Sequence, residues 1–246
     1  AQCSSRVDAT YTFMHQEHAY LEPEGALAIP HGDGSLTIYA NNQSPFINRD
    51  NTSSVLGLRP DQVRSIQPFV GAAFGGKDDG VYQCSAQAAK LALFARRPVQ
   101  LLLTVDESMV ASYKREAMQL RMRLGASDQG TVRAARVEIL ADSGAYASMT
   151  PLSTWRATVH AAGPYRYEAA HVDTRAVYTN NGYAGACRGF GNTEATAASE
   201  MAIDELAHKL GVDPIDFRLK NGLTQGDRAF TGNRIEPAVG LARCLT

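Results

Sequence analysis

The sequence lacks the cysteine and histidine spacings that bind metal ions or iron–sulfur clusters. Its four cysteines are widely scattered, and no pair has the CxxC spacing; they are Cys3, Cys84, Cys187 and Cys244. No HExxH pair occurs among the six histidines. Neither a zinc site nor a cluster site is therefore indicated. We expect reduced, buried thiols and no metal held by protein side chains.

Long hydrophobic runs and excess charge are missing as well. No window approaches the roughly 18 consecutive apolar residues of a membrane span, and the first residues do not have the pattern of a signal peptide. The formal net charge of the 246 residues is -1, and the arginines and lysines are dispersed. Nothing favours binding to nucleic acid or to an anionic membrane. We expect a soluble, cytoplasmic protein.

Three common catalytic signatures are absent. Lys77 is followed by Asp78, where a phosphate-binding P-loop requires serine or threonine. The glycines between Gly185 and Gly191 do not have the GxGxxG spacing of a dinucleotide-binding turn. No GxSxG segment occurs, so a serine hydrolase of that type is not supported.

The most informative segment is the glycine-rich turn VGAAFGGKD at residues 70–78. It follows an apolar run, predicted to be a strand over Val63–Val70, and precedes a helical pattern that Asp78 or Asp79 can cap. Glycine lets a backbone approach a ligand closely, and the first N–H groups of a helix attract anions. Because Phe74 is unusual in a plain turn, the segment indicates an anion or cofactor cradle. A tight strand-to-helix turn without a ligand is the alternative.

A second glycine-rich turn spans residues 180–191 and also contains a phenylalanine. It precedes a helical pattern that Asn192 or Thr193 can cap. Two such turns in one chain can together hold one planar, polyanionic ligand. Arg188 supplies a rigid fork of donors suited to phosphate, carboxylate or a substrate carbonyl. An equally simple interpretation is that Arg188 caps a neighbouring helix or pairs with Glu194.

The remaining pattern predicts an α+β fold. Alternating apolar and polar residues predict a hairpin of Met118–Leu124 and Val132–Leu140 with one solvated face. Residues 1–35 and 142–164 show little periodicity, and the second stretch is long enough to be functional or buried. The other expected elements are strands at Leu36–Ala40, Val99–Val105 and His171–Tyr178 and helices at 46–58, 78–95, 192–210 and 213–221.

Two motifs carry a resemblance to a known family. The segments FGGKD at 74–78 and GACRGFG at 185–191, in this order, resemble the molybdenum-binding subunit of the xanthine dehydrogenase/aldehyde oxidase family, the molybdenum hydroxylases. The similarity runs nearly end to end. It also includes His18–Pro23, Gln43, Arg97–Val99, Asp142–Tyr146, Gly163–Tyr165, Tyr178–Asn180, Glu200–Asp204 and Leu210–Pro214.

The resemblance implies mixed sheets with packed helices, with residues 1–246 forming the first molybdopterin-binding domain. The family's catalytic base is a glutamate in the C-terminal half of the full subunit, and this sequence has no match to it. We therefore expect a fragment of a longer subunit that is inactive alone. The expected cofactor is molybdopterin with molybdenum, in the cytosine dinucleotide form. The expected partners are the remaining half of the subunit and iron–sulfur and FAD subunits or domains.

The resemblance also implies which residues contact the cofactor. Gln43 would approach the molybdenum oxo group or the pterin. Phe74 and Gly75 would lie against the molybdenum centre, with the Gly75 backbone N–H directed towards an oxo ligand. Arg188 is expected beside them. The molybdenum itself would be held by the pterin and not by side chains.

Three residues are implied to act on the substrate. Arg156 matches an arginine that stabilises charge on purines, and Arg188 matches the arginine that orients substrate. Asp78 stands where the purine enzymes carry a glutamate, and its shorter side chain argues against a strict purine site. Cys187 stands where mammalian purine enzymes have a substrate-stacking phenylalanine, which implies a wider pocket. Because it precedes the arginine, whereas the copper-binding cysteine of carbon monoxide dehydrogenases follows theirs, no copper is expected.

The implied reaction is hydroxylation of a carbon beside a ring nitrogen, or of an aldehyde, with water as the oxygen source. Fixed cations such as Arg156 and Arg188 would stabilise negative charge that builds on a ring. We expect a xanthine dehydrogenase-like enzyme that oxidises purines or other N-heteroaromatic compounds. The alternatives are an aldehyde-oxidising member, for which Arg156 and Asp78 would be idle, and a non-catalytic relative that uses the fold for binding or assembly.

Overall fold

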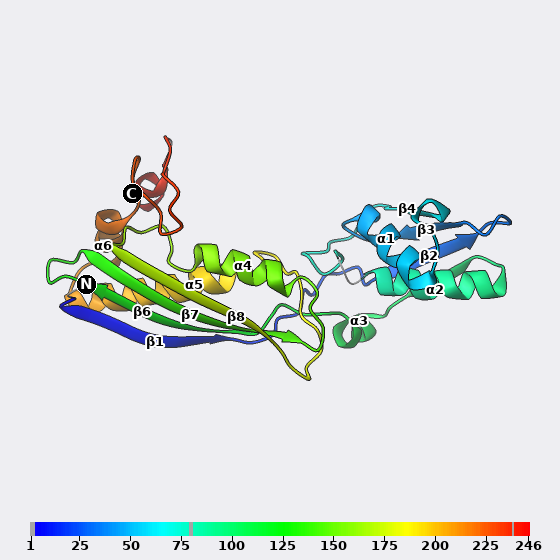
Figure 1. Ribbon diagram of the computed structural model, residues 1–246, viewed down its shortest axis with the longest axis horizontal. Coiled ribbons are helices and arrows are strands. Elements are labelled where there is room, and N and C mark those ends of the chain that lie inside the picture. Colours follow the sequence, from blue (N-terminus) through cyan, green and yellow to red (C-terminus); the bar gives the residue numbers. More distant parts are fainter. Residues whose placement is uncertain (1–2, 79–80, 238) are drawn as a thin grey trace.

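The computed structural model describes residues 3–78, 81–237 and 239–246, and these residues form two lobes (Figure 1). The large lobe is built on a four-stranded sheet of order β1-β6-β7-β8, and the small lobe on a four-stranded sheet of order β4-β3-β2-β5. The strands are β1 (Ser5–Phe13), β2 (Gly25–Pro30), β3 (Leu36–Ala40), β4 (Val63–Ile66), β5 (Val99–Leu102), β6 (Met118–Ala126), β7 (Val132–Gly144) and β8 (Ala169–Tyr178). The helices are α1 (Pro45–Leu56), η1 (Pro60–Gln62), α2 (Val81–Ala95), α3 (Val105–Ala111), α4 (Thr150–His160), α5 (Asn192–Leu210), α6 (Pro214–Asn221) and α7 (Leu241–Leu245). Each sheet contains both parallel and antiparallel pairs, which confirms the predicted α+β fold with mixed sheets.

The large lobe buries one face of its sheet and leaves the other face open. Helices α4 and α5 pack on the buried face (Figure 1). Helix α5 presents small side chains to the strands, and Ala195, Ala198 and Ala202 are fully buried. Because these side chains are short, the helix can lie close to the sheet and exclude water from the apolar residues of β6 and β7.

The small lobe is inserted in the chain between two neighbouring strands of the large lobe. Strand β1 pairs antiparallel with β6, and the whole small lobe lies between them in the sequence. Helix α2 packs on the small sheet through a narrow face of small residues, as predicted from the sequence; Val81, Cys84, Ser85, Ala88, Ala89 and Ala92 are buried, whereas Ala95 is exposed. The chain therefore passes between the lobes twice, once before and once after the small lobe.

Several predicted elements are confirmed. The hairpin of β6 and β7, the strand β3 and the parallel edge strand β8 lie where the alternating pattern placed them. Helices α1 and α5 end at Gly57 and Gly211, whose left-handed φ of 68° favours glycine. Asp213 caps α6 by accepting the backbone N–H groups of Ile215 and Asp216.

Other predictions are wrong at particular elements. Residues 1–35, predicted to be irregular, contain β1 and β2. Strand β1 does alternate apolar and polar residues, a strand signal that the prediction overlooked; its apolar positions are Val7, Ala9, Tyr11 and Phe13. The stretch 142–164 contains α4, a helix rich in serine and threonine that intrinsic propensity does not favour. Strands β4 and β5 stop at Ile66 and Leu102, before the ends expected.

The sequence also predicted the N-cap residues of two helices, α5 and α2. The N-cap of α5 is Gly191 and not Asn192 or Thr193. Helix α2 begins at Val81, and the predicted cap Asp79 lies outside the described residues. Within the described ranges, no helix is both long and apolar enough to span a bilayer.

Gly144, at the end of β7, lies directly against another backbone segment. Its φ is +70°, and a Cβ placed on it would be 2.1 Å from the carbonyl oxygen of Gly182. Asp142 stabilises this contact between the two backbone segments, because its side chain accepts hydrogen bonds from Thr179 Oγ1 and Asn181 Nδ2, each at 2.6 Å. The contact of Gly144 with Gly182 fixes the segment that leads into the second glycine turn.

We expect Gly144→Ala to destabilise the protein by about 3 kcal/mol or more, because it combines left-handed strain with a backbone clash. Gly211→Ala is the matched control: its φ is +68°, with nothing within 4 Å of the added Cβ. That variant should lose only about 1 kcal/mol. Urea unfolding of both variants measures the difference, and equal losses would show that the contact with Gly182 does not constrain Gly144.

Candidate functional site

The two glycine turns, which lie in the segments between the labelled elements of the two lobes, are joined by a backbone hydrogen bond. The Arg188 backbone N–H donates to the Phe74 carbonyl oxygen at 2.9 Å. A Cβ on Gly75 would lie 2.7 Å from the Ala186 carbonyl oxygen, and Gly75 has a φ of +96°. Only glycine fits this conformation and this approach, so the pair of turns is a single structural unit.

Gln43, just before α1, is attached to the first turn. Its Oε1 accepts the Gly75 backbone N–H at 2.9 Å, and its own backbone N–H donates to the Lys77 carbonyl oxygen at 2.9 Å. The Gly75 N–H, for which the resemblance implied an oxo ligand, is thus donated to Gln43. Because Oε1 is the acceptor, the amide Nε2 is the group that the exposed Gln43 side chain can donate to a ligand.

The buried side chain of Lys77 anchors the first turn. The Lys77 side chain is fully buried, with its Nζ 2.7 Å from Glu22 Oε2 and 4.9 Å from the centre of the Tyr20 ring. Burial opposes ionisation of Glu22, but hydrogen bonds from Lys77 and from the Gly71 backbone outweigh it and lower the pKa of this carboxyl group. Together with a hydrogen bond from the Tyr113 hydroxyl to the Gly75 carbonyl oxygen, these contacts fix the turn.

The second turn is held by a neutral histidine. His18 Nε2 donates to the Ala186 carbonyl oxygen at 2.7 Å. Burial lowers the pKa of His18, so the ring is neutral at pH 7 and carries its proton on Nε2. The predicted alternative pairing of Arg188 with Glu194 is wrong, because Glu194 pairs with Arg115 at 3.0 Å and the Arg188 side chain is exposed.

A cleft opens beside the joined turns. Phe74, which is 45% exposed, lies on it together with Arg188 and Cys187. Burial raises the pKa of the Cys187 thiol, which therefore stays protonated at neutral pH. The other lining residues are Gln16, Glu17, His18, Arg115, Gly189 and Thr193.

Arg156 reaches the second turn from α4. The carbon atom of its guanidinium lies 5.7 Å from the centre of the Phe190 ring, a cation–π contact. Phe190 itself has a φ of +55°, which is rare for a bulky residue and shows that the turn imposes its conformation. The Arg156 side chain is exposed, so the ring orients the cation without neutralising it.

Asp78 lies apart from these residues. The Ser44 hydroxyl donates to its Oδ1 at 2.6 Å, which ties the end of the first turn to the start of α1. Among the described residues, those that line the cleft include Phe74 and Arg188 but not Gln43, Gly75, Arg156 or Asp78. The structure thus brings together Gln43, Phe74, Gly75 and Arg188, connects Arg156 to them through Phe190, and leaves Asp78 at the edge.

Sequence reasoning missed three residues of this site. Phe190 had a signal, since each glycine turn contains one phenylalanine. Tyr113 and Arg115 had none, because the positions next to them in the sequence belong to no motif and their contacts are long-range.

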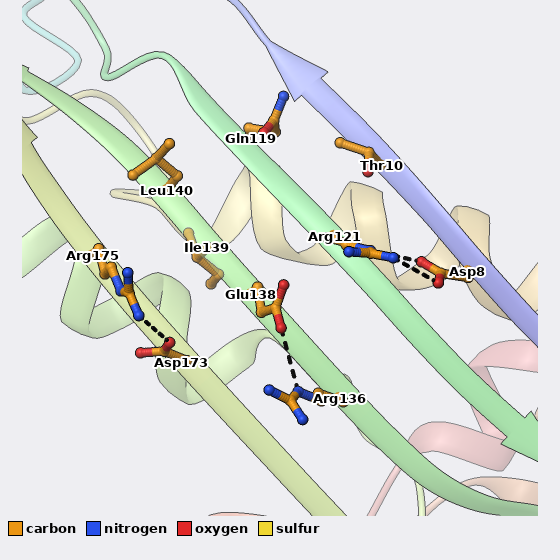
Figure 2. Close-up of a pocket in the computed structure, with 10 residues that line it drawn as sticks. All are labelled: Asp8, Thr10, Gln119, Arg121, Arg136, Glu138, Ile139, Leu140, Asp173 and Arg175. Atoms are coloured by element: carbon orange, nitrogen blue, oxygen red, sulfur yellow. Dashed lines mark hydrogen bonds and ion pairs between the residues drawn. The ribbon is translucent and has the colours of Figure 1, made fainter.

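The open face of the large sheet carries a second hollow, away from the turns (Figure 2). Its charged side chains pair with one another: Arg121 with Asp8 at 2.8 Å, Arg136 with Glu138 at 3.3 Å, and Arg175 with Asp173 at 3.3 Å. Such pairs are typical of a solvated sheet face, so we place the functional site at the turns.

The donor groups at the turns fit an oxo-bearing, anionic cofactor. The exposed Gln43 amide and Arg188 guanidinium both present N–H groups, and the backbone contact between the two turns holds these residues near each other. Among residues 3–78, 81–237 and 239–246, no group of three or more His, Cys, Asp or Glu side chains can hold a metal ion.

Comparison with known proteins agrees with this chemistry. The family model described as molybdopterin cofactor-binding domain matches residues 1–222. The nicotinate dehydrogenase large molybdopterin subunit of Eubacterium barkeri is 38% identical over 99% of this chain and 57% of its own length. A probable xanthine dehydrogenase subunit of Bacillus subtilis (strain 168) is 37% identical over 97% of this chain and 32% of its own length.

A solved structure shows the same fold. The aldehyde oxidoreductase of Desulfovibrio gigas superposes with a TM-score of 0.88 at 28% sequence identity, covering 99% of this chain and 26% of that chain. The present chain spans little more than half of the first relative and about a third of the second. The chain therefore belongs to the molybdopterin cofactor-binding domains of the xanthine dehydrogenase and aldehyde oxidoreductase type of molybdenum hydroxylase.

Proposed function

We propose that this chain forms the first part of the cofactor and substrate site of a molybdenum hydroxylase that oxidises purines or other N-heteroaromatic compounds. The observation that carries the proposal is the joining of the two glycine turns. It brings Gln43, which accepts the Gly75 backbone N–H, close to the turn of Arg188, and Arg188 lines the cleft. When bound, the cofactor supplies the redox centre that adds a water-derived oxygen atom to the substrate.

The roles of the protein residues follow from their contacts. Gln43 donates from its amide Nε2 to the cofactor, and Phe74 and Gly75 form the wall against it. Arg188 orients the substrate, because its guanidinium is exposed at the cleft and its backbone is fixed. Arg156 stabilises negative charge on the substrate ring from its place over Phe190. Asp78, shorter than the family's glutamate and bonded to Ser44, acts at the edge of the site.

The partners and setting belong to the same proposal. We propose molybdopterin in its cytosine dinucleotide form, iron–sulfur and FAD partner subunits, and a cytoplasmic location. Turnover requires the remaining half of the molybdenum subunit, so this chain alone is inactive. Turnover of hypoxanthine by the isolated, metal-loaded chain would contradict that requirement.

Replacing Arg156 with alanine tests the substrate class. In the complete enzyme we expect Arg156→Ala to lower kcat/KM for purine or nicotinate-type substrates about 100-fold, because one donor to developing charge is lost. Aldehyde turnover should change much less, since no ring charge develops. Arg175→Ala, on the open face of the large sheet, is the matched control and should leave both rates unchanged. Equal losses for both substrates would count against a site that oxidises purines or other N-heteroaromatic compounds.

The aldehyde alternative has an observation in its favour, the 28% sequence identity with the aldehyde oxidoreductase of Desulfovibrio gigas over 99% of this chain. A non-catalytic relative is the other alternative. Molybdenum and pterin analysis of the complete protein, expressed with sufficient cofactor, separates it from both enzymes: neither component would be present.

A further inference from the structure

Arg115, immediately before β6, is a buried arginine beneath the second glycine turn. It is 7% exposed. Its guanidinium contacts three separate segments of the chain: Nε donates to Gln16 Oε1 at 3.2 Å, Nη1 to Thr193 Oγ1 at 2.7 Å, and Nη2 to the Arg188 carbonyl oxygen at 2.5 Å. A single side chain therefore links the chain crossing between the lobes, the glycine turn and the start of α5.

We propose that Arg115 is a positioning residue that sets the direction of the Arg188 side chain. The Arg188 backbone is held from both sides: its N–H donates to Phe74 at 2.9 Å and its carbonyl oxygen accepts from Arg115. With both peptide groups fixed, only side-chain rotation remains free for Arg188. Arg115 thus acts on the cleft through the backbone of the residue that lines it.

Thr193 gives Arg115 a second hold on the same turn. A Cβ on Gly189 would lie 2.6 Å from Thr193 Oγ1, so this hydroxyl packs directly on the turn, and Arg115 donates to it. Glu194, 3% exposed, lies 3.0 Å from Arg115 Nη1 and balances the buried charge. The ion pair with Glu194 keeps the guanidinium in place. Its hydrogen bonds to the uncharged acceptors, Thr193 Oγ1 and the Arg188 carbonyl oxygen, fix the turn relative to it.

An arginine is needed because the acceptors lie in three directions. Guanidinium has five N–H donors in one plane, whereas the lysine ammonium has three donors on a single atom. Arg115→Lys therefore keeps the attraction to Glu194 but cannot reach Gln16, Thr193 and the Arg188 carbonyl oxygen together. A residue needed only for its charge would tolerate this change.

The test is hydrogen–deuterium exchange in the complete holoenzyme. Arg115→Lys is expected to speed amide exchange in residues 186–191 by about tenfold, with exchange in β6 and β7 unchanged. Arg121→Lys is the matched control, since it alters an arginine that pairs with Asp8 on the open sheet face. It should leave the turn unchanged. Unaltered exchange in the turn of Arg115→Lys would overturn the proposal, as would equally faster exchange throughout the large lobe.

Thr193→Val provides an independent variant if Arg115→Lys does not fold. It removes one acceptor of Arg115 at constant volume, and we expect faster exchange confined to the same turn. Unchanged exchange there would also overturn the proposal.

The effect on substrate rests on the proposed function. Arg115→Lys should raise KM for an N-heteroaromatic substrate several-fold, and it should have no further effect in an Arg188→Gln background. If Arg188→Gln alone leaves KM unchanged, the role of Arg188 in substrate binding fails, while the exchange measurement still decides whether Arg115 positions the turn. Additive effects of the two changes on KM would contradict an action of Arg115 through Arg188.

Discussion

Replacing Gly75 with alanine is expected to separate the two glycine turns and to abolish cofactor retention. The added Cβ would lie 2.7 Å from the Ala186 carbonyl oxygen, 2.9 Å from its carbon atom and 3.2 Å from the Cys187 Cα atom. All three are backbone atoms, which cannot rotate away. The φ of +96° adds left-handed strain. Together these effects disfavour the joined turns by about 3 kcal/mol, roughly a hundredfold in their population.

The measurement is the molybdenum and pterin content of the purified complete enzyme. Gly57→Ala is the matched control in the same lobe, because its φ is +68° and nothing lies within 4 Å of its added Cβ. It should retain full cofactor despite similar backbone strain. A Gly75→Ala enzyme with normal molybdenum content would show that the contact between the turns is not required for binding.

Ionisation of the buried Glu116 carboxyl group is expected to lower the free energy of unfolding as the pH rises towards neutral. Replacing Glu116 with glutamine is expected to remove this pH-dependent loss. Glu116 is 1% exposed, and its Oε2 accepts a hydrogen bond from Ser153 Oγ at 3.0 Å. Burial, assisted by the nearby carboxylate of Glu194, raises the pKa of Glu116 to about 7, although its hydrogen bonds oppose the rise. Of these two buried acids, Glu194 is the one that pairs with the buried Arg115.

The sign of the pH dependence follows from proton binding. Between the ordinary glutamate value of 4.5 and about 7, the folded protein binds a proton at Glu116 that the unfolded chain has released. This contribution is fully present below pH 4.5 and is lost as the pH rises through 7. It amounts to about 3 kcal/mol, given about 1.4 kcal/mol for each pKa unit.

Urea unfolding of the protein and of Glu116→Gln between pH 4.5 and 8 measures this contribution. The difference between the two curves should grow by about 3 kcal/mol across that range in favour of the variant. Taking the difference cancels other titrating groups, including His18. Parallel curves for Glu116→Gln would contradict a buried, protonated Glu116.

The parts of the fold that the sequence predicted are those with local causes. The hairpin of β6 and β7 follows from strict alternation, and α5 follows from a helical pattern that ends at Gly211. Strand β1 also has a local signal, the alternation of its apolar residues with polar ones, which the prediction of an irregular segment overlooked; only its pairing with β6, far along the chain, is non-local. Helix α4 forms because packing on α5 and the large sheet outweighs the weak helix propensity of its serines and threonines.

The same distinction applies to the site. Motif resemblance named Gln43, Phe74, Gly75 and Arg188, and the structure brings these residues together. It did not indicate Arg115, whose partners in other segments are recognisable only once the chain has folded. The substrate roles of these residues stay predictions that the variants above will test.

The insertion of the small lobe between β1 and β6 determines the order in which the lobes form during synthesis. Strand β1 leaves the ribosome early, but its partner Met118–Ala126 follows only after the complete small lobe. Until then the backbone donors and acceptors of β1 have no strand to pair with, and closing the intervening loop has an entropic cost. The strand pairs of the small sheet all lie within residues 25–102, so the small lobe can fold while the large sheet is still being made. The joined glycine turns therefore form last, when the segment after β8 reaches a small lobe that already has its shape.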